Sequence, residues 1–376
     1  MNFLRMLNIL FINQFSEMGG GEKALLSIIK NLDKTRYRPS VVLPRAGKLS
    51  KALKDMKVSC HFVAIGEYSD GRKKLVDVLK YLIFSFNVVP KLIERIKKDH
   101  IDIIYANSPR VLPWACLAAR AGRARVIWHV RCISGRLEKK VASAFAKDIK
   151  MIIVDSQAAK NSLSAGGIPV RVIPAGIDLS LFPAGLPFGA GEQPPVIGAA
   201  GRLVKLKGFE DLIMAAPIVL QKFPNVRFTI LGDALFGKED YKEHLSRLIE
   251  DMGLKDKFLL PGFVDDMAAA YREMGLFVNC SRCEGFGYVV VEAMASGLPI
   301  VASDIPSVRE IAGQDGRIEF YQPGDTEGLA AAVIKLLKEP SLAMAMAEKN
   351  KAVVKERFDE KKQIRKIEQI IDQVCR

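Results

Sequence analysis

Short, continuous apolar runs recur along the whole chain at intervals long enough to hold a helix. In the first half they are LNILFIN (7–13), SVVLP (40–44), SCHFVAI (59–65), IDIIYAN (101–107), RVIWHV (125–130), MIIVDS (151–156) and RVIPAG (171–176). Runs without polar alternation are typical of strands buried on both faces, as in parallel sheets covered by helices. The pattern therefore predicts an α/β fold with a Rossmann-like, doubly wound parallel sheet.

The same pattern starts again in the second half. Its runs are PVIGAAG (195–201), VRFTILG (226–232), KFLLPG (257–262), LFVNCS (276–281), PIVASD (299–304) and RIEFYQ (317–322), followed by helical patterns at 325–338, 341–357 and 359–376. A length of 376 residues exceeds what one core usually supports. Because residues 181–195 are rich in Gly and Pro, we predict two Rossmann-like domains, 1–185 and 186–358, followed by a C-terminal helix at 359–376.

Charge is divided unequally between the halves. Residues 1–190 carry 31 Lys and Arg against 14 Asp and Glu, a net +17, whereas residues 191–376 carry 25 against 28, a net −3. A strongly basic half predicts an anionic partner, either nucleic acid or an acidic membrane surface. No aromatic and basic motif typical of nucleic-acid binding is present, so we expect no nucleic acid.

The remaining composition points to the cytoplasm. The longest apolar stretch, residues 81–90, is too short to span a bilayer. The N-terminal run lacks a small-residue cleavage site and is interpreted as a strand. Six scattered cysteines form no disulfide framework and suit a reducing compartment.

The stretch CSRCEGFGYVVVEAMASGLPIVASD (280–304) has the pattern of a strand end, a turn, a helix and a second strand. A helix N-terminus in such a unit offers free N–H groups to phosphate. Glu284 and Glu292 lie toward one side of the helix if it begins near Phe286, and carboxylates accept hydrogen bonds from vicinal hydroxyls. These features describe a nucleotide-sugar pocket. The alternative is that the acids only offset the helix dipole and the glycines only form the turn.

Two further details of this stretch bear on its chemistry. Cys280 and Cys283 form a C-x-x-C, but no second Cys or His pair is nearby to complete a metal site. No D-x-D motif occurs in the chain. We therefore expect no metal.

The segment GRLVKLKG (201–208) gathers Arg202, Lys205 and Lys207 just before a helix expected to begin near Gly208. The helix dipole disfavours each cation there by ~0.3–1 kcal/mol, and a bound anion would remove that conflict. The alternative is solvated loop cations, which is the better interpretation for Lys205.

Two features of the first half suggest a second part of the site. MGGGEKALL (18–26) follows the first strand and opens a helix, but it matches neither G-x-G-x-x-G nor a Walker A sequence, so no dinucleotide or ATP site is indicated. His129 ends its apolar run at the edge of the sheet where ligands bind. The alternatives are a flexible turn for the glycines and a structural role for His129.

Five segments in order carry a resemblance to a known family. They are MGGGEKALL (18–26), VIPAGID (172–178), GRLVKLKG (201–208), LPGFVDD (260–266) and the E-x7-E of EGFGYVVVE (284–292). Together they resemble the retaining family-4 glycosyltransferases of the group 1 type, whose GT-B fold sets two Rossmann-like domains across a cleft. The resemblance implies sugar transfer from a nucleotide diphosphate donor, with no other cofactor, to a saccharide acceptor of the lipid-linked, lipopolysaccharide or exopolysaccharide kind.

The resemblance also implies site residues and their roles. Arg202 and Lys207 would bind the diphosphate, Glu292 the ribose, and Glu284 the sugar, with a donor phosphate oxygen taking the acceptor proton. The residues implied in catalysis are Glu284, His129, Arg202 and Lys207, and those implied in donor binding are Gly20, Gly21, Arg202, Lys207, Glu284, Gly285, Phe286, Gly287, Tyr288 and Glu292. In the family the C-terminal helix packs back across both domains.

Residues 71–100 are the candidate membrane contact. Basic residues lie at both ends of this segment, around an apolar middle. The basic residues are Arg72, Lys73, Lys74, Lys80, Lys91, Arg95, Lys97 and Lys98, and the apolar ones are Leu79, Leu82, Ile83, Phe84 and Phe86. This pattern predicts a helix at the anionic inner face of the membrane, although a Rossmann helix with one buried face and solvated ends would give the same pattern. Two other functions stay open, a non-catalytic membrane-docked scaffold and a nucleotide-sugar epimerase on the same fold.

Overall fold

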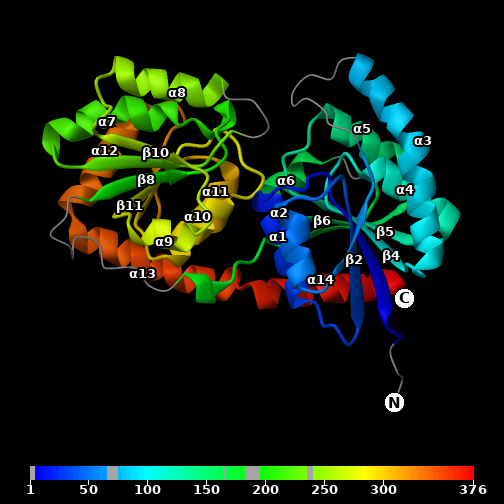
Figure 1. Ribbon diagram of the computed structural model, residues 1–376. Coiled ribbons are helices and arrows are strands. Elements are labelled where there is room, and N and C mark those ends of the chain that lie inside the picture. Colours follow the sequence, from blue (N-terminus) through cyan, green and yellow to red (C-terminus); the bar gives the residue numbers. More distant parts are fainter. Residues whose placement is uncertain (1–4, 66–74, 164–165, 183–194, 235–239) are drawn as a thin grey trace. The chain divides into compact units, whose positions relative to one another are not determined.

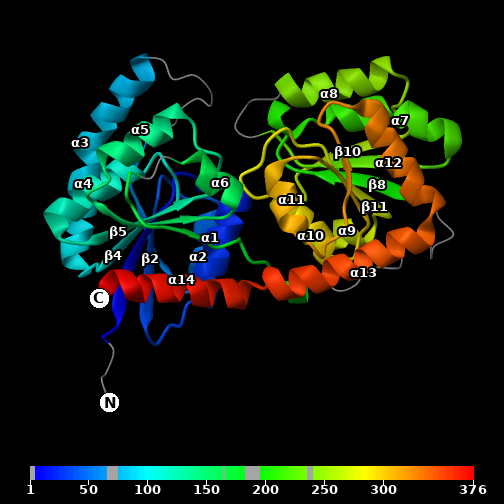
Figure 2. The same cartoon turned by 180° about the vertical axis from the view of Figure 1, so that it is seen from behind.

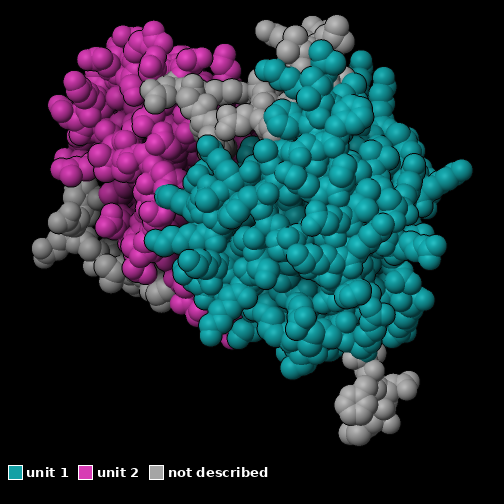
Figure 3. Space-filling model, turned by 45° about the vertical axis from the view of Figure 1, so that its right-hand side comes forward, with its two compact units in different colours: residues 1–176, 360–376 teal, residues 177–359 magenta. Residues whose placement is uncertain are grey.

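The computed structural model describes residues 5–65, 75–163, 166–182, 195–234 and 240–376. The chain divides into two compact units, which Figure 3 colours separately. Unit 1 comprises residues 1–176 and 360–376, and unit 2 comprises residues 177–359. The chain leaves unit 1 at Gly176, whereas the boundary expected at residue 185 lies outside the described residues.

The described residues of unit 1 form one parallel sheet of seven strands in the order β3-β2-β1-β4-β5-β6-β7. The strands are β1 (Leu7–Ile12), β2 (Tyr37–Leu43), β3 (Ser59–Phe62), β4 (Ile103–Ala106), β5 (Arg125–Val130), β6 (Ile149–Val154) and β7 (Val170–Val172). Successive side chains of a strand point to opposite faces. Leu10 and Ile12 accordingly join one buried cluster, and Ile9 and Phe11 join another.

Helices cover both faces of this sheet (Figure 1 and Figure 2). One face packs against α3 (Leu75–Lys98), α4 (Leu112–Gly122), α5 (Arg136–Ala144) and α6 (Gln157–Ser162), and the other against α1 (Gly20–Asn31), α2 (Lys48–Asp55) and α14 (Glu360–Cys375). The apolar runs read from the sequence are therefore the buried strands of a doubly wound sheet.

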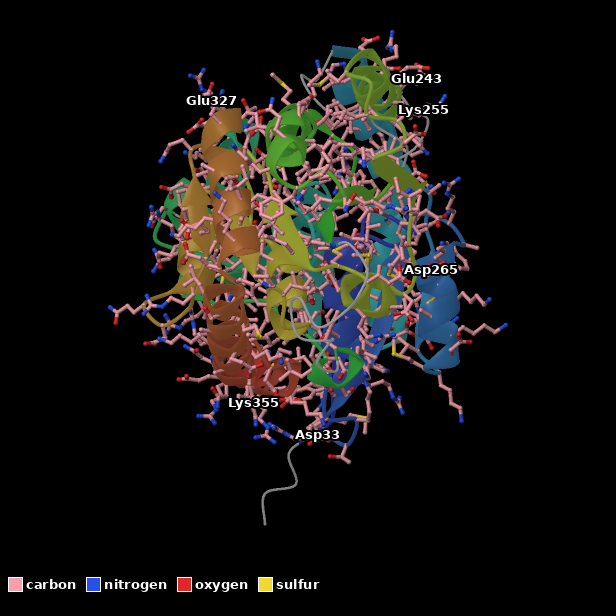
Figure 4. All side chains as sticks on the ribbon, turned by 90° about the vertical axis from the view of Figure 1, so that its left-hand side faces the viewer. Asp33, Glu243, Lys255, Asp265, Glu327 and Lys355 are labelled. Atoms are coloured by element: carbon pink, nitrogen blue, oxygen red, sulfur yellow. The ribbon has the colours of Figure 1, made fainter. Side chains whose placement is uncertain are left out.

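Helix α14 returns to unit 1 after the chain has completed unit 2. Its isoleucines pack against one face of the sheet, and its polar side chains accept hydrogen bonds from α1 and from the loop that follows α1. Glu360 accepts a hydrogen bond from Ser27 (2.6 Å), and Glu368 accepts one from the backbone N–H of Asp33 (2.8 Å), a residue labelled in Figure 4. A Cβ on Gly176 would lie 2.3 Å from the Cα of Glu360, so this glycine permits the close approach of the returning chain.

Unit 2 repeats the architecture. Its described residues form six parallel strands in the order β10-β9-β8-β11-β12-β13. These are β8 (Val196–Ala200), β9 (Arg227–Leu231), β10 (Phe258–Gly262), β11 (Leu276–Asn279), β12 (Ile300–Ser303) and β13 (Glu319–Tyr321). The helices are α7 (Glu210–Lys222), α8 (Asp240–Asp251), α9 (Met267–Arg272), α10 (Tyr288–Ala295), α11 (Pro306–Ala312), α12 (Thr326–Lys338) and α13 (Pro340–Arg357), with single 3-10 turns at η1 (Leu179–Leu181) and η2 (Lys205–Lys207).

The predicted fold class is confirmed: each unit is a Rossmann-like domain built on a wholly parallel sheet. Within the described residues, no helix has both the length and the apolar character needed to cross a bilayer.

Candidate functional site

The sheet of unit 2 reverses its strand order between β8 and β11, because the chain runs from β8 to β9 on one side and later places β11 on the other. Open α/β sheets bind ligands at the carboxyl ends of strands at this switch point. The loop after β8 carries Lys207, the loop after β11 carries Glu284, and their side chains form an ion pair. Two residues 77 positions apart, both singled out from the sequence, thus meet where a ligand is expected.

Glu284 is held in place by a second contact. Its Oε1 atom, which faces the Lys207 ammonium, also accepts a hydrogen bond from the Ser281 hydroxyl (2.7 Å). Ser281 is itself tied to the sheet, because its carbonyl accepts from the Ser303 hydroxyl at the end of β12 (2.6 Å). The carboxylate is therefore oriented by the ends of three neighbouring strands, β8, β11 and β12.

A buried aspartate and an arginine link the same loops, and sequence reasoning missed both. Arg282 forms a bidentate ion pair with Asp211 at the start of α7, and this hydrogen bond raises the pKa of Arg282. Asp211 also accepts from the backbone N–H of Gly324 (3.0 Å). The pair joins the loops after β8, β11 and β13. Its partners lie 71 residues apart, and no local signal in the sequence pairs them.

The cations of the first loop have different surroundings. The helix begins at Glu210, two residues later than predicted, and Lys205 and Lys207 lie in the 3-10 turn η2. Arg202 and Lys205 are exposed, whereas Lys207 is partly buried. Within the described part of the chain, no acid pairs with Arg202 or Lys205, so the charge of Arg202 is available to an anion.

Helix α10 begins at Tyr288 and not near Phe286, so Glu284 precedes the helix. The start is two residues later than predicted because Gly287 takes a left-handed conformation (φ 107°), and Glu284 lies in the turn before the helix, as predicted. Glu292 lies on α10, is only 4% exposed, and accepts a hydrogen bond from the Tyr271 hydroxyl (3.0 Å).

The residues between Glu284 and Glu292 differ in burial. Phe286 is buried with its ring edge-on to Phe358 (5.7 Å between centroids), whereas Gly285 and Tyr288 are partly exposed. The donor contact predicted for Phe286 thus falls on a side chain that already packs in the core of unit 2. Tyr271, the partner of Glu292, was not identified from the sequence.

The cysteine pair has no metal-site geometry. Burial raises the pKa of Cys280 to about 12 and that of Cys283 above its usual range. Thiols bind metals as thiolates. Among the described residues, no group of three or more His, Cys, Asp and Glu side chains is placed to hold a metal ion.

Unit 1 has its own switch point, between β1 and β4. The residues that follow these strands are Asn13 and Asn107, and the amide of Asn107 donates to Oδ1 of Asn13 (2.8 Å). Asn13 in turn donates to Glu22 in the first turn of α1 (3.0 Å), and Asn107 accepts from Arg131 (3.0 Å). A buried polar network therefore follows the carboxyl edge of the sheet.

His129 lies inside this network. Its Nε2 faces Asp155 (2.7 Å), and its Nδ1 faces the Tyr105 hydroxyl (2.6 Å) and the Arg131 guanidinium (3.1 Å). A carboxylate accepts and a guanidinium donates, so Nε2 carries the proton and Nδ1 accepts. Burial first, and then the Arg131 charge, lower the pKa of His129 to about 4. Burial alone would raise the pKa of Asp155, but Arg131 and His129 hold it below its usual value.

The glycines of the first loop border the same network. Gly20 and Gly21 open α1. A Cβ on Gly20 would meet nothing within 4 Å, and one on Gly21 would lie 3.6 Å from Cδ of Arg131. The structure thus brings Gly21, Arg131 and His129 together within unit 1, and Lys207 and Glu284 together within unit 2. Arg202 belongs to the same loop as Lys207, and Glu292 lies on α10.

Two units, each built on a Rossmann-like parallel sheet with its own switch point, define the GT-B fold, which similar solved structures share. Residues 187–353 match the model of the glycosyl transferases group 1, and residues 18–181 match that of glycosyltransferase family 4. The chain belongs to this family of group 1, family 4 glycosyltransferases.

Individual relatives agree with that assignment. The chain is 31% identical over 189 residues to the lipopolysaccharide core biosynthesis mannosyltransferase LpcC of Rhizobium leguminosarum bv. viciae, a match that covers 48% of this chain and 53% of the relative. It is 28% identical over 260 residues to the phosphatidyl-myo-inositol mannosyltransferase of Mycolicibacterium smegmatis, covering 66% of this chain and 65% of that one. The chain spans about half the length of several curated relatives that it matches.

Solved structures match along nearly the whole chain. The crystal structure of Anabaena HepE in complex with UDP-glucose is 25% identical with a TM-score of 0.83, and the match covers 98% of this chain and 100% of that one. The likeness therefore extends across both units.

Proposed function

We propose that the protein transfers a sugar from a nucleotide diphosphate donor to a saccharide acceptor, with retention of configuration and without a metal ion. The observation that carries the proposal is the meeting of Lys207 and Glu284 at the switch point of unit 2, with an exposed Arg202 in the same loop as Lys207. The complex of the similar HepE with UDP-glucose supports a nucleotide-sugar donor.

In this proposal the cations bind the donor diphosphate. Lys207 exchanges its contact with Glu284 for a phosphate oxygen, and Arg202 adds a planar fork of donors. Both then stabilise the negative charge that builds on the leaving diphosphate, and electrostatic stabilisation of this kind often contributes more to catalysis than any other effect. Two cations at this position can supply the charge that a metal would bring, and the chain has no D-x-D motif.

The carboxylates act on hydroxyl groups. Both described donors to Glu284 reach Oε1, which leaves Oε2 to accept from a sugar hydroxyl. The resemblance gives Glu292 the ribose contact, and in this structure its buried carboxylate accepts a hydrogen bond from the Tyr271 hydroxyl. Retention follows the resemblance, with a donor phosphate oxygen accepting the proton of the acceptor.

The acceptor we propose is a lipid-linked saccharide or a polysaccharide precursor at the cytoplasmic face of a membrane. Two of the relatives support this, since one is named for lipopolysaccharide core biosynthesis and another for phosphatidyl-myo-inositol. The basic charge of the first half agrees with it.

Replacing Lys207 with Ala tests the diphosphate contact. We expect transfer from the productive nucleotide sugar, found with a panel of donors, to fall at least ~10²-fold, as when one electrostatic contact to developing charge is lost. Lys205→Ala is the matched control, because Lys205 lies in the same 3-10 turn but is exposed, and it should keep near wild-type turnover. Equal turnover in the two variants, both folded, would refute the assignment. Interconversion of nucleotide sugars without transfer would instead support an epimerase, and binding without any turnover a scaffold.

Chelation tests the metal-free part of the proposal. Because Arg202 and Lys207 are proposed to hold the diphosphate, transfer should persist after EDTA treatment and dialysis. Loss of transfer that Mg²⁺ or Mn²⁺ restores would contradict it.

A further inference from the structure

The outer face of α3 carries an apolar stripe. Leu79, Leu82, Ile83 and Phe86 are 58%, 53%, 59% and 84% exposed. Their spacing of three and four residues places them side by side along one side of the helix. We call these four residues the α3 stripe. A surface helix usually turns polar residues to this side, so the stripe needs an explanation.

The residues of the α3 stripe do not contribute to the packing of α3 against the rest of unit 1. Its inner face is formed by other residues, among them Val88, Leu92 and Ile96, which are buried in unit 1. Tyr81 stacks on Trp114 of α4 with ring centroids 4.5 Å apart, and Phe84 is partly buried against the same cluster. Between Leu79 and Phe86 the helix therefore has apolar side chains on both sides, and packing within unit 1 accounts for only one of these sides.

Basic residues continue the outer face toward the end of the helix. Lys97 lies 18 residues, or about five turns, after Leu79 and so shares the side of the stripe. Lys80, Lys91 and Lys98 are also exposed, and Glu94 is the exposed acid among the described side chains of α3. An apolar stripe followed by lysines fits a bilayer interface, where the apolar side chains contact the acyl chains and the lysines contact the headgroup phosphates.

The charge of the units supports an anionic partner for this face. Unit 1 contains 36 Lys and Arg against 16 Asp and Glu, a net +20, whereas unit 2 contains 20 against 26, a net −6. A second copy of unit 1 would be repelled by a surface of the same sign. An anionic bilayer would be attracted, and it also accepts exposed apolar side chains.

We propose that the α3 stripe inserts into the interface of an anionic phospholipid bilayer, with Lys97 and Lys98 on the headgroups. The inference rests on the proposed function, because the membrane contact would bring unit 1 to a membrane-borne acceptor. It refines the expectation from the sequence, because Phe84 is partly buried against the core of unit 1. Arg72, Lys73 and Lys74, which were also predicted to contact the membrane, lie outside the described residues.

Flotation of the full-length protein with vesicles tests the surface. The vesicles are phosphatidylcholine alone, or phosphatidylcholine with about one third phosphatidylglycerol. We expect the protein to float only with the anionic vesicles and to be released by salt, which screens the lysines. The double variant Ile83→Ser with Phe86→Ser should bind at least about tenfold more weakly, since affinity scales with inserted apolar area. Lys97→Gln with Lys98→Gln should bind at least about fivefold more weakly.

Matched variants on unit 2 are the controls. Met214 and Leu259 are exposed apolar residues of unit 2, and Lys222 and Lys349 are exposed lysines of unit 2. Met214→Ser with Leu259→Ser, and Lys222→Gln with Lys349→Gln, should float like the wild type. The inference is overturned if the stripe variant binds like the wild type, if the wild type ignores anionic vesicles at low salt, or if the stripe proves to hold a dimer in solution.

Turnover of the donor separates this inference from the proposed function. Hydrolysis or transfer with a soluble acceptor should be unchanged in the stripe variant, because the α3 residues lie outside the switch points. If vesicles bind as expected but no nucleotide sugar is turned over, the proposed function fails and the membrane surface stands. If turnover is present and vesicle binding is absent, the surface fails and a soluble acceptor follows.

Discussion

At the scale of single residues, neighbours decide what a titratable group can do. His129 is a candidate catalytic residue by the family resemblance, yet Asp155, Tyr105 and Arg131 occupy both of its ring nitrogens. Because its pKa is lowered to about 4, the imidazole is neutral near pH 7 and accepts a hydrogen bond from Arg131. We therefore infer that His129 positions Arg131 within unit 1, and that any contact with a donor would require one of these bonds to break.

The lowered pKa predicts a dependence of stability on pH. In the unfolded chain His129 binds a proton below about pH 6.5, whereas in the folded chain it does so only near pH 4. Protonation of His129 therefore stabilises the unfolded state as the pH falls. The neutral, buried His129 contributes up to about 3 kcal/mol to the free energy of unfolding above pH 6.5, and this contribution is lost toward pH 4.

Urea unfolding of wild type and His129→Gln, at about pH 7 and about pH 5, measures this contribution. The glutamine amide can donate to Asp155 and accept from Tyr105, but it does not titrate. We expect the wild type to lose more of its free energy of unfolding on acidification than the variant does. His244→Gln, at an exposed position of unit 2, should follow the wild type. Equal losses in wild type and His129→Gln would contradict the account.

At the scale of elements, the position of Lys207 depends on how the turn η2 meets the end of β11. Gly208 follows η2 in a left-handed conformation (φ 58°), and a Cβ there would lie 2.4 Å from the carbonyl oxygen of Cys280. The backbone N–H of Arg282 also donates to the carbonyl of Leu206 (2.8 Å). The two loops are thus joined through their backbones, which sets the distance between Lys207 and Glu284.

Substitution of Gly208 by Ala should disturb both the fold and the site. A left-handed alanine costs ~1–2 kcal/mol by itself, and the contact with the Cys280 carbonyl forces the loops apart at further cost. Gly253→Ala is the control, since Gly253 has a similar φ of 66° but nothing within 4 Å of its Cβ.

We expect Gly208→Ala to lower the free energy of unfolding of unit 2 by ~3 kcal/mol or more, and Gly253→Ala by only ~1–2 kcal/mol. Nucleotide affinity, measured by titration of the folded variants, should fall in Gly208→Ala alone. Equal losses of stability in Gly208→Ala and Gly253→Ala would show that the close approach of Gly208 to the Cys280 carbonyl does not contribute to stability.

At the scale of the whole molecule, two units of one architecture differ in charge and in the chemistry of their switch points. Unit 1 is basic and carries a buried network in which Asn13, Asn107 and a neutral His129 are hydrogen-bonded to the charged side chains of Glu22, Arg131 and Asp155. Unit 2 is slightly acidic and carries a lysine and a glutamate that a ligand can separate. The division agrees with a donor site in unit 2 and with an acceptor approached through the basic unit.

The sequence by itself determined the strands and the fold class. A strand buried on both faces must be a continuous apolar run, and such runs can be read locally. The resemblance to the family also predicted that Lys207 and Glu284 belong to one site. Tertiary structure alone decided the partners. Arg282 with Asp211, Glu292 with Tyr271 and His129 with Asp155 meet because strand order brings distant loops together. Strand order is set by the crossovers of the whole sheet and not by any local pattern. For the same reason only the packed helix α3 shows that Phe84 faces inward while Phe86 faces out.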